Sequence, residues 1–517
     1  MAGLSQVIRS HIALQPLTTE VGSTLLLDHL QLKSPSNTDR KAASTITELV
    51  GGLPIAVAHI AGSMFSSQLT LFEAIEMFEK QRLRSIWSTE KTWSTHMYDQ
   101  RLNMVWDIAL KELTQNAMHL IDILALLSPD AIPETMILGG EDTGTFPQGF
   151  SKSVFDSLCI PRLLTLHSVF TEIRSNLTKR QLVQRNTATS EPYLSLHRSL
   201  QLNLRDGLST DQVKYHKVFK EAVSLVQRVF PVQHKTMSVE NEKWVDYEKY
   251  QPHVQALQIV AQKSQQPIGE LPSFAQLLGD AANYYWERGL LTIGVETCHF
   301  AVSIYESIPQ PDLLAFSQPL TLWGLMALEM GISCREIGLR CFVRCLDLRA
   351  EYLSKAPGGG TRDEQLLYCN AWSDYSIALL EFGYYDEAER FINLNLALKS
   401  RNVTEKTYAM MFGISYGHLA TIYASRRKYK EAKAFSARSV QMARVDYRPH
   451  SAALQKYLFF QANIWSDAGD LDKALASHQN ILRERIEIFG PFGSHTRYSY
   501  YALGATHHKL GHLDAAE

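Results

Sequence analysis

The chain has 517 residues, of which 45% are hydrophobic and 20% are charged, and its formal net charge is −2 at pH 7. This composition is typical of folded globular proteins and excludes a wholly disordered chain, while the length predicts about three to five domains. The near-neutral charge and the lack of any apolar run approaching roughly 18 residues argue against general binding to nucleic acid and against insertion in a membrane.

The first residues predict a short extended segment followed by a helix. Ile12 to Leu14 reads as the end of a strand, and Pro16 as a turn. A helix then begins at Thr18 or Thr19 and ends near KSPSNTD, a polar segment that contains helix breakers.

The next segment predicts a tight corner between two helices. The first of these has Thr38 or Asn37 as its N-cap and Gly51 in the left-handed position after its end. Its apolar face comprises Ala42, Ile46, Leu49 and Val50. Pro54 suits the first position of the second helix, since its missing N–H is not needed there. That helix, PIAVAHIAG, is apolar nearly all round, so we expect it to be buried, with His59 as a hydrogen-bonded core histidine. Such a corner needs no role beyond packing.

Residues 98–230 predict a mixed module. Its first helix has apolar residues at helical spacing, namely Leu102, Val105, Trp106, Ala109, Leu110 and Leu113. Thr114 caps a second helix, which Ser128-Pro129 ends. Residues 160–200 are richer in β-branched residues, and SEPYLSLHRSLQ reads as a strand running into a helix. This order suggests a winged-helix-like fold. Residues 98–210 hold 10 Lys and Arg against 12 Asp and Glu, which argues against a DNA-binding face.

Residues 245–517 contain an internal repeat with a period of about 42 residues. The segments align on a turn residue between two helices, at Gly289, Gly383, Arg427, Gly469 and Gly511, and the first interval leaves room for one more unit around Gly331. Small residues recur seven positions before the turn residue and five after it, where two antiparallel helices must approach closely. The array therefore has about six units, the last of them incomplete.

These repeats resemble tetratricopeptide repeats, specifically the variety found in kinesin light chain. NILRERIEIFGPFGSHTRYSYYALG carries that variety's linker pattern. The resemblance implies an α-solenoid, and the fold class of the whole chain is expected to be mainly α.

The upstream half resembles the second part of an NB-ARC domain, the nucleotide switch of NLR-like STAND ATPases of the fungal type. GGLPIAVAHIAGSM resembles the GLPL-type motif, and LSLHRSLQ resembles the histidine-bearing motif near the end of the winged-helix module. The resemblance implies that Pro54 lies near an adenine and that His197 reaches a β-phosphate. Residues 1–97 would then be a partial NB-ARC helical lobe, followed by the winged-helix-like module at 98–230 and the repeats at 245–517.

The phosphate-binding half of that family is not found in the sequence. No G-x-x-x-x-G-K-[ST] motif occurs, so no glycine-rich loop and lysine can cradle phosphates. We therefore expect no cofactor, with ADP or ATP binding only if an upstream P-loop half is restored. Both ends of the sequence are expected to lie within modules, as in a gene fragment or a degenerate relative, and the exposed apolar surface predicts self-association.

Other chemistry-bearing residues do not predict a catalytic or metal site. Cys334, Cys341 and Cys345 share one helical face, but buried apolar cysteines are commoner than metal ligands. His508 and His512 have the i, i+4 spacing of zinc ligands, but Gly511 lies between them at a turn. The six cysteines are irregularly spaced and no signal-peptide pattern is present, which predicts reduced thiols and a cytoplasmic location. We expect no enzymatic activity.

The repeats predict a protein-binding groove. In tetratricopeptide arrays the first helix of each unit lines a concave groove. The positions of these helices that face the groove are here Asn283, Trp286, Asn370, Thr421, Lys456, Phe459, Asn463, Tyr498, Tyr501 and His508. Amides, aromatic rings and a lysine suit an extended peptide, although they are also ordinary solvated side chains of such a groove. The favoured function is a non-enzymatic, NLR-like signalling protein that binds a protein or peptide. The alternative is a plain repeat scaffold with a vestigial N-terminal half.

Overall fold

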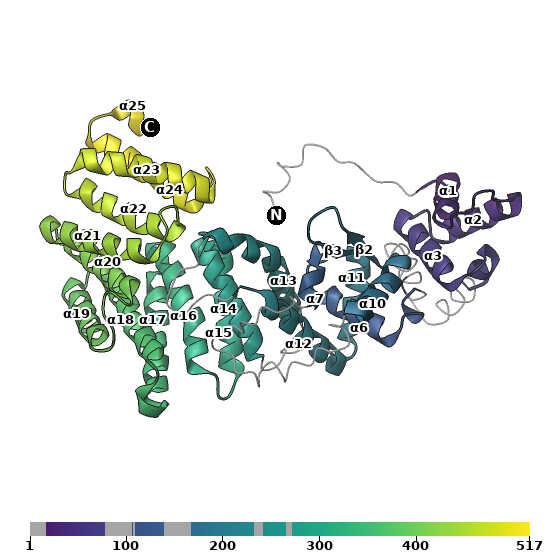
Figure 1. Cartoon of the computed structure of the whole chain (residues 1–517), viewed down its shortest axis with the longest axis horizontal. Helices are drawn as coiled ribbons and strands as arrows, with labels where there is room; N and C mark the ends of the chain where they lie inside the picture. Colours follow the sequence, from purple (N-terminus) through teal and green to yellow (C-terminus); the bar gives the residue numbers. More distant parts are fainter. Residues whose placement is uncertain (1–16, 78–105, 107–108, 139–166, 232–240, 265–270) are drawn as a thin grey trace. The chain divides into compact units, whose positions relative to one another are not determined.

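The computed structural model describes residues 17–77, 106, 109–138, 167–231, 241–264 and 271–517, and the chain is mainly α-helical (Figure 1). It forms two compact units, Met1–Arg228 and Val229–Glu517. The expected strand end at 12–14 and most of the helix expected around Leu102 and Val105 lie outside the described residues. Among the described residues, no helix is both long and apolar enough to cross a bilayer.

The first unit begins with three helices, α1 (Thr19–His29), α2 (Asn37–Leu49) and α3 (Pro54–Ser67). The helix α1 begins at Thr19, within the predicted start at Thr18 or Thr19, and Thr18 is its N-cap. The predicted caps of α2, Thr38 and Asn37, are wrong, because Ser36 caps this helix in a reciprocal capping box with Asp39.

The corner between α2 and α3 matches the prediction and adds a constraint. Gly51 has a φ of +66° and Gly52 a φ of +68°. A Cβ at Gly52 would lie 2.3 Å from the carbonyl oxygen of Leu17, so the chain segment before α1 passes directly over this glycine. Pro54 is the first residue of α3, and most of the helix is buried. His59 is a core histidine whose Nδ1 lies 3.3 Å from the carbonyl oxygen of Arg180.

The rest of the unit comprises α6 (Gln115–Leu126), β1 (Ile132–Pro133), α7 (Glu134–Leu138), α10 (His167–Lys179), β2 (Val183–Asn186), β3 (Tyr193–Leu196), α11 (Arg198–Ser209) and α12 (Gln212–Val229). The three strands form an antiparallel sheet in the order β1-β3-β2. In the register, Ile132 pairs with Leu194 and Val183 pairs with Leu196. Thr114 caps α6, as predicted.

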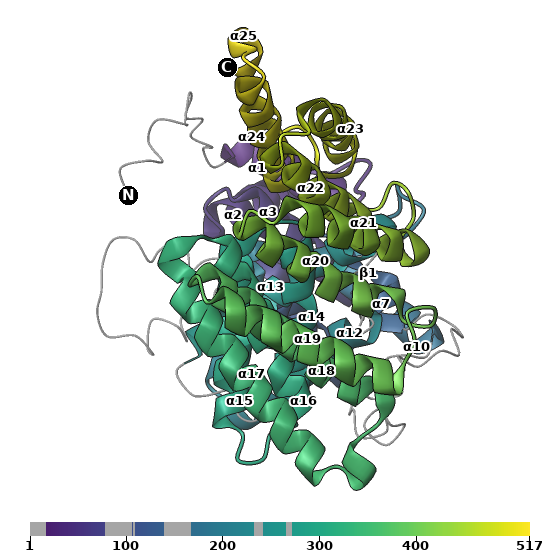
Figure 2. The same cartoon turned by 90° about the vertical axis from the view of Figure 1, so that its left-hand side faces the viewer.

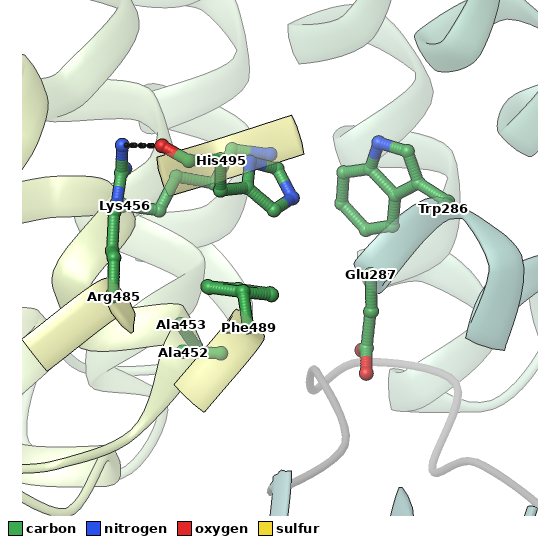
Figure 3. A pocket seen from close by; sticks show the side chains of 8 residues that line it. All are labelled: Trp286, Glu287, Ala452, Ala453, Lys456, Arg485, Phe489 and His495. Atoms are coloured by element: carbon green, nitrogen blue, oxygen red, sulfur yellow. Dashed lines mark hydrogen bonds between the residues drawn. The ribbon is translucent and has the colours of Figure 1, made fainter. Parts of the chain in front are cut away.

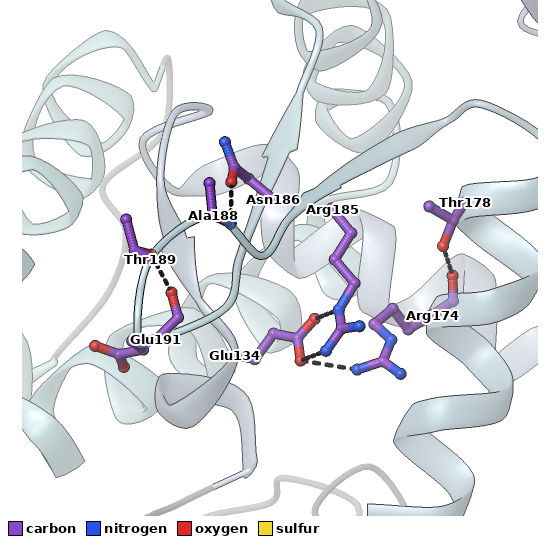
Figure 4. Close-up of polar contacts among 8 residues, drawn as sticks. All are labelled: Glu134, Arg174, Thr178, Arg185, Asn186, Ala188, Thr189 and Glu191. Carbon is purple, nitrogen blue, oxygen red and sulfur yellow. Dashed lines mark hydrogen bonds and ion pairs between the residues drawn. The ribbon is translucent and has the colours of Figure 1, made fainter.

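A buried carboxylate joins three of these elements (Figure 4). Glu134, at the start of α7, is buried and accepts hydrogen bonds from Arg174 Nη1 on α10 at 2.8 Å and from Arg185 Nε on β2 at 2.7 Å. Removal of one partner would leave a poorly compensated charge in the interior, which is strongly destabilising. The pair of arginines therefore fixes β2 and α10 against the same end of α7.

The second unit is a stack of helix pairs (Figures 1 and 2). The helix α13 (Trp244–Lys263) comes first, and six pairs follow in residues 271–517. They are α14 (Pro272–Glu287) with α15 (Leu291–Ser307), α16 (Leu313–Glu329) with α17 (Arg335–Lys355), α18 (Arg362–Glu381) with α19 (Tyr385–Asn402), α20 (Ala409–Ser425) with α21 (Tyr429–Asp446), α22 (Ala452–Asp467) with α23 (Leu471–Phe489), and α24 (Ser494–Lys509) with α25 (Leu513–Ala516). The predicted α-solenoid is confirmed, and one of the pairs in residues 271–517 is the unit around Gly331.

Every turn between paired helices contains one residue in the left-handed region. The φ angles are +68° at Gly289, +99° at Gly331, +81° at Gly383, +58° at Arg427, +86° at Gly469 and +80° at Gly511. In all but the Gly331 turn, the next residue's N–H bonds to the carbonyl four positions before the turn residue, as Asp470 does to Trp465 at 2.9 Å. This Schellman arrangement satisfies carbonyl groups at the end of each first helix.

Small residues make the close approach of paired helices possible. Ala282, Ala420 and Ala462, seven positions before their turn residues, are buried. In the second pair the equivalent is Gly324, where a Cβ would lie 2.5 Å from the ring of Phe342. The small residue after the turn is Gly338, seven positions on rather than five, because the short 3-10 helix Ile332–Cys334 adds two residues.

Arg427 provides a test of the turn geometry. A residue with a side chain is strained by about 1–2 kcal/mol in this left-handed conformation. Glycine removes this strain, but part of the gain in stability is offset because glycine increases the entropy of the unfolded chain. We expect Arg427→Gly to raise the free energy of unfolding by ~0.5–1 kcal/mol and Gly469→Arg to lower it by a similar amount. Nothing lies within 4 Å of a Cβ at Gly469, so the arginine there would add backbone strain but no steric clash. Denaturant unfolding followed by circular dichroism measures both. Equal stability of the two variants would contradict the interpretation.

Candidate functional site

The first helices of the six pairs form one continuous surface. α14 packs against α16, α16 against α18, α18 against α20, α20 against α22, and α22 against α24. The second helices of successive pairs make no comparable contact in residues 271–517. The first helices are therefore the more closely spaced set, so they line the inner side of the curved stack, and the predicted groove residues lie on them.

Four of the predicted groove residues are open to a ligand. Asn463 on α22 is half-buried, while Tyr498, Tyr501 and His508 on α24 are exposed. Tyr501 is 80% exposed and Tyr498 is 47% exposed. Two tyrosine rings and an amide at one end of the inner surface can provide large contact area at low entropic cost together with backbone hydrogen bonds.

Four others interact mainly within the array. Asn283 on α14 is only 3% exposed, so it offers a ligand little surface. Asn370 on α18 donates from Nδ2 to the sulfur of Met411, and Thr421 on α20 donates to the carbonyl of Gly417 in its own helix. Phe459 on α22 lies 4.2 Å under the guanidinium of Arg485. Thr421 and Phe459 thus have partners within the array, whereas Asn283 Nδ2 and Asn370 Oδ1 are buried without a hydrogen-bond partner among the described residues.

The remaining two predicted residues come together. Lys456 Nζ on α22 lies 4.2 Å from the ring centre of Trp286 on α14 and 3.6 Å from Glu329 Oε1 on α16. Trp286 Nε1 also donates to Glu329 Oε1 at 2.8 Å. Sequence reasoning missed Glu329, because the predicted groove residues included none from the unit around Gly331, although the 42-residue interval from Gly289 had located that unit.

Three buried cations join successive pairs from the second helix. Arg349 donates to the carbonyl of Leu367, Lys399 to that of Met411 at 2.7 Å, and Arg485 to that of His495 at 2.9 Å. Lys399 and Arg485 occupy the same position relative to their turn residues, and Arg349 does so once the insertion is allowed for. Among the described residues, no carboxylate lies within ion-pair distance of these three side chains. The cations thus act as hydrogen-bond donors to the next first helix.

Polar groups on the inner helices have perturbed protonation. Burial raises the pKa of Asp374 on α18 to about 6, opposed by the charges of Arg349 and Lys399. Burial lowers the pKa of His418 on α20 to about 4, and its Nδ1 lies 3.0 Å from Ser373 Oγ. At neutral pH the imidazole of His418 is therefore uncharged.

The residues assigned to a nucleotide lie in the first unit. Pro54 begins α3 and is exposed. His197 is exposed and caps α11, where its Nδ1 accepts the N–H of Ser199 at 3.2 Å. His59, by contrast, packs edge-on to Trp106 at 4.2 Å, and burial lowers its pKa to about 3. The described residues thus offer an exposed proline and an exposed imidazole, but no backbone cradle for phosphates at either.

Metal ligation finds no support in the described part of the chain, where no group of three His, Cys, Asp or Glu side chains is suitably placed. Cys341 and Cys345 are buried, and burial raises the pKa of both thiols. His512 lies beside His507, with their Nδ1 atoms 3.4 Å apart, rather than beside His508.

Comparison with known proteins gives a limited family assignment. Residues 108–213 match the family model described as "Domain of unknown function (DUF7779)". No curated protein matches the chain.

Solved structures resemble the chain loosely. A STAND protein with a tetratricopeptide repeat sensor from Pyrococcus horikoshii has 12% identity and a TM-score of 0.39, over 98% of this chain and 66% of that one. Aspartyl phosphate phosphatase F from Bacillus subtilis has 9% identity and a TM-score of 0.40, over 83% and 93%. Putative kinesin light chain repeats from Podosopora anserina have 14% identity and a TM-score of 0.29, over 42% and 98%. At such TM-scores these likenesses carry no argument about function. This chain spans 66% of the length of the archaeal protein.

Lys399 makes the stability of the array depend on pH. It is fully buried, and burial lowers its pKa from 10.5 to about 8. Between pH 8 and 10.5 the Lys399 amine is protonated in the unfolded chain but not in the native chain. The free energy of unfolding therefore rises with pH in this range, and the stability gained in this way is lost again as the pH falls to 8. Relative to Lys399→Met, we expect the wild type to gain ~1–2 kcal/mol between pH 8 and 9.5.

Denaturant unfolding at the two pH values measures this difference. The exposed Lys433, paired with Asp470 at 3.0 Å, provides the control variant Lys433→Met. A pH-independent difference between wild type and Lys399→Met would show that Lys399 keeps its ordinary pKa.

Proposed function

We propose that the chain is a non-enzymatic protein-interaction molecule whose repeat array binds an extended peptide segment on its inner surface. The observation that carries this proposal is the exposure of Tyr498 and Tyr501 on α24 and the accessibility of Asn463 on α22, two first helices that pack against each other at one end of that surface. Exposed tyrosines on a rigid helical scaffold are well suited to a peptide partner, because little conformational entropy is lost on binding.

We further propose that the first unit is a regulatory lobe of the NLR-like kind, with a winged-helix-like module and a degenerate nucleotide lobe. The described order of helix, strand, two helices and two strands, with the sheet order β1-β3-β2, supports the winged-helix interpretation. The corner at Gly51, Gly52 and Pro54 supports the GLPL-type interpretation. The alternative is a plain scaffold in which this unit only packs.

The first test concerns the inner surface. Peptides selected from a random phage-displayed library on the immobilised full chain would be measured by fluorescence polarisation. We expect Asn463→Ala/Tyr501→Ala to weaken binding by about 5- to 30-fold, equivalent to ~1–2 kcal/mol, because both side chains would contact the peptide.

The control is Tyr384→Ala, which removes a half-exposed tyrosine at the turn between α18 and α19, away from the inner surface. Circular dichroism would verify that all variants remain folded. Equal affinity of the double variant and the wild type would exclude this end of the inner surface as the peptide site.

The second test concerns nucleotide. Without the glycine-rich loop and lysine, phosphates have no backbone N–H cradle. We expect the dissociation constant for ADP to exceed ~1 mM, that is, less than ~4 kcal/mol of binding free energy, with no ATP turnover above a buffer blank. Isothermal calorimetry and a phosphate-release assay measure both, and micromolar ADP affinity would contradict the degenerate-lobe proposal.

A further inference from the structure

The two ends of the array touch within the second unit. Asn241 Oδ1, just before α13, accepts the N–H of Ala452 at the start of α22 at 3.1 Å. Ser494 Oγ, at the start of α24, donates to the carbonyl of Gly289 in the first turn at 3.1 Å. The ring of Trp244 on α13 lies 5.4 Å from that of Phe489 on α23. These contacts join residues about two hundred positions apart, so the stack of pairs closes on itself.

A small cavity of about 40 Å³ lies at this junction (Figure 3). Trp286 and Glu287 of α14 form one wall, and Lys456, Arg485, Phe489 and His495 of α22, α23 and α24 form the other. In Figure 3 the indole of Trp286 faces the side chains of His495 and Lys456 across the gap. The space is sufficient for a few water molecules. The two walls meet where Lys456 Nζ lies 4.2 Å from the ring centre of Trp286.

The polar contacts at the junction are partly exposed. The side chain of Lys456 is 37% exposed and that of Glu329 is 28% exposed, and such pairs contribute little to stability. The side chain of Trp244 is buried, but the helices that meet across the junction pack less extensively than neighbouring helices of the array do. The junction therefore separates at a lower energetic cost than the interfaces between neighbouring helices.

We propose that this junction is an intramolecular latch that restricts access to the inner surface. In the closed array, Trp286 and Lys456 are bound to each other and to Glu329, so a partner that uses them must first displace these contacts. Asn241, Ser494, Trp244 and Phe489 hold the same closed state without belonging to the predicted binding residues. This inference rests on the proposed peptide-binding function, because it concerns the regulation of the same surface.

Opening can be measured on the full chain without any ligand. Spin labels attached through p-acetylphenylalanine at Val245 on α13 and Val445 on α21, both strongly exposed, report the distance across the junction. The latch variant is Asn241→Ala/Ser494→Ala, which removes two closing hydrogen bonds and no predicted binding residue. We expect one narrow distance distribution in the wild type and an added population at longer distance in the variant.

The matched control is Lys433→Gln, which breaks the Lys433–Asp470 ion pair between neighbouring units, with similarly exposed side chains. It should leave the distance distribution unchanged. A phage-selected peptide that also contacts Trp286 and Lys456 provides the second readout: the latch variant should bind it roughly threefold or more tightly, because less binding energy is used to open the array.

The outcomes separate this inference from the function on which it rests. Identical distance distributions in the wild type and the latch variant would overturn the latch, whatever the peptide affinity. An opened variant with unchanged peptide affinity would also overturn it, because the junction would then be only structural. Loss of binding in Asn463→Ala/Tyr501→Ala tests the peptide site independently, since neither residue belongs to the junction.

Discussion

The array depends on one steric constraint, the close crossing of the two helices in each pair. Antiparallel helices approach most closely where both carry small side chains, and the connecting turn must then reverse the chain within a few residues. Gly324 shows how tight this contact is, since a single added Cβ would overlap the ring of Phe342. The left-handed residue in each turn satisfies the second requirement. Everything else in the second unit, including its inner surface, follows from the repetition of this crossing.

Local features of this kind were predictable from the sequence because they recur. The turn residues and the alanines at fixed distances from them, such as Ala420 and Ala462, located five pairs directly. The Gly331 pair was found only by its interval, because two inserted residues moved the small residue from the expected position to Gly338. Helix starts were predictable to within a residue or two. Thr114 caps α6 as expected and α1 begins at Thr19, whereas the reciprocal hydrogen bonds with Asp39 select Ser36 over its neighbours as the cap of α2.

The candidate site was less predictable, for a physical reason. Repeat periodicity tells which positions of a helix point to the inner surface, but not what approaches them from distant units. Lys456 and Trp286 were predicted as separate ligand contacts, and in the structure Glu329 joins them. Their proximity is set by the total curvature of five helix pairs, a sum of many small crossing angles that no local pattern encodes. Tyr501, at the last pair, has no such neighbour and remains open.

The cations that join successive pairs have a consequence for how the array responds to ionic strength. Lys399 and Arg485 donate to main-chain carbonyls and hydroxyls rather than to carboxylates, and they are buried. Mobile ions screen exposed charge pairs but have little effect on hydrogen bonds that water and salt do not reach. The array therefore holds polar contacts of two kinds: the hydrogen bonds of the buried cations are insensitive to dissolved salt, whereas partly exposed ion pairs, such as Lys456 with Glu329 and Lys433 with Asp470, weaken as salt is added. A change in ionic conditions would weaken these ion pairs and leave the buried hydrogen bonds between neighbouring pairs unchanged.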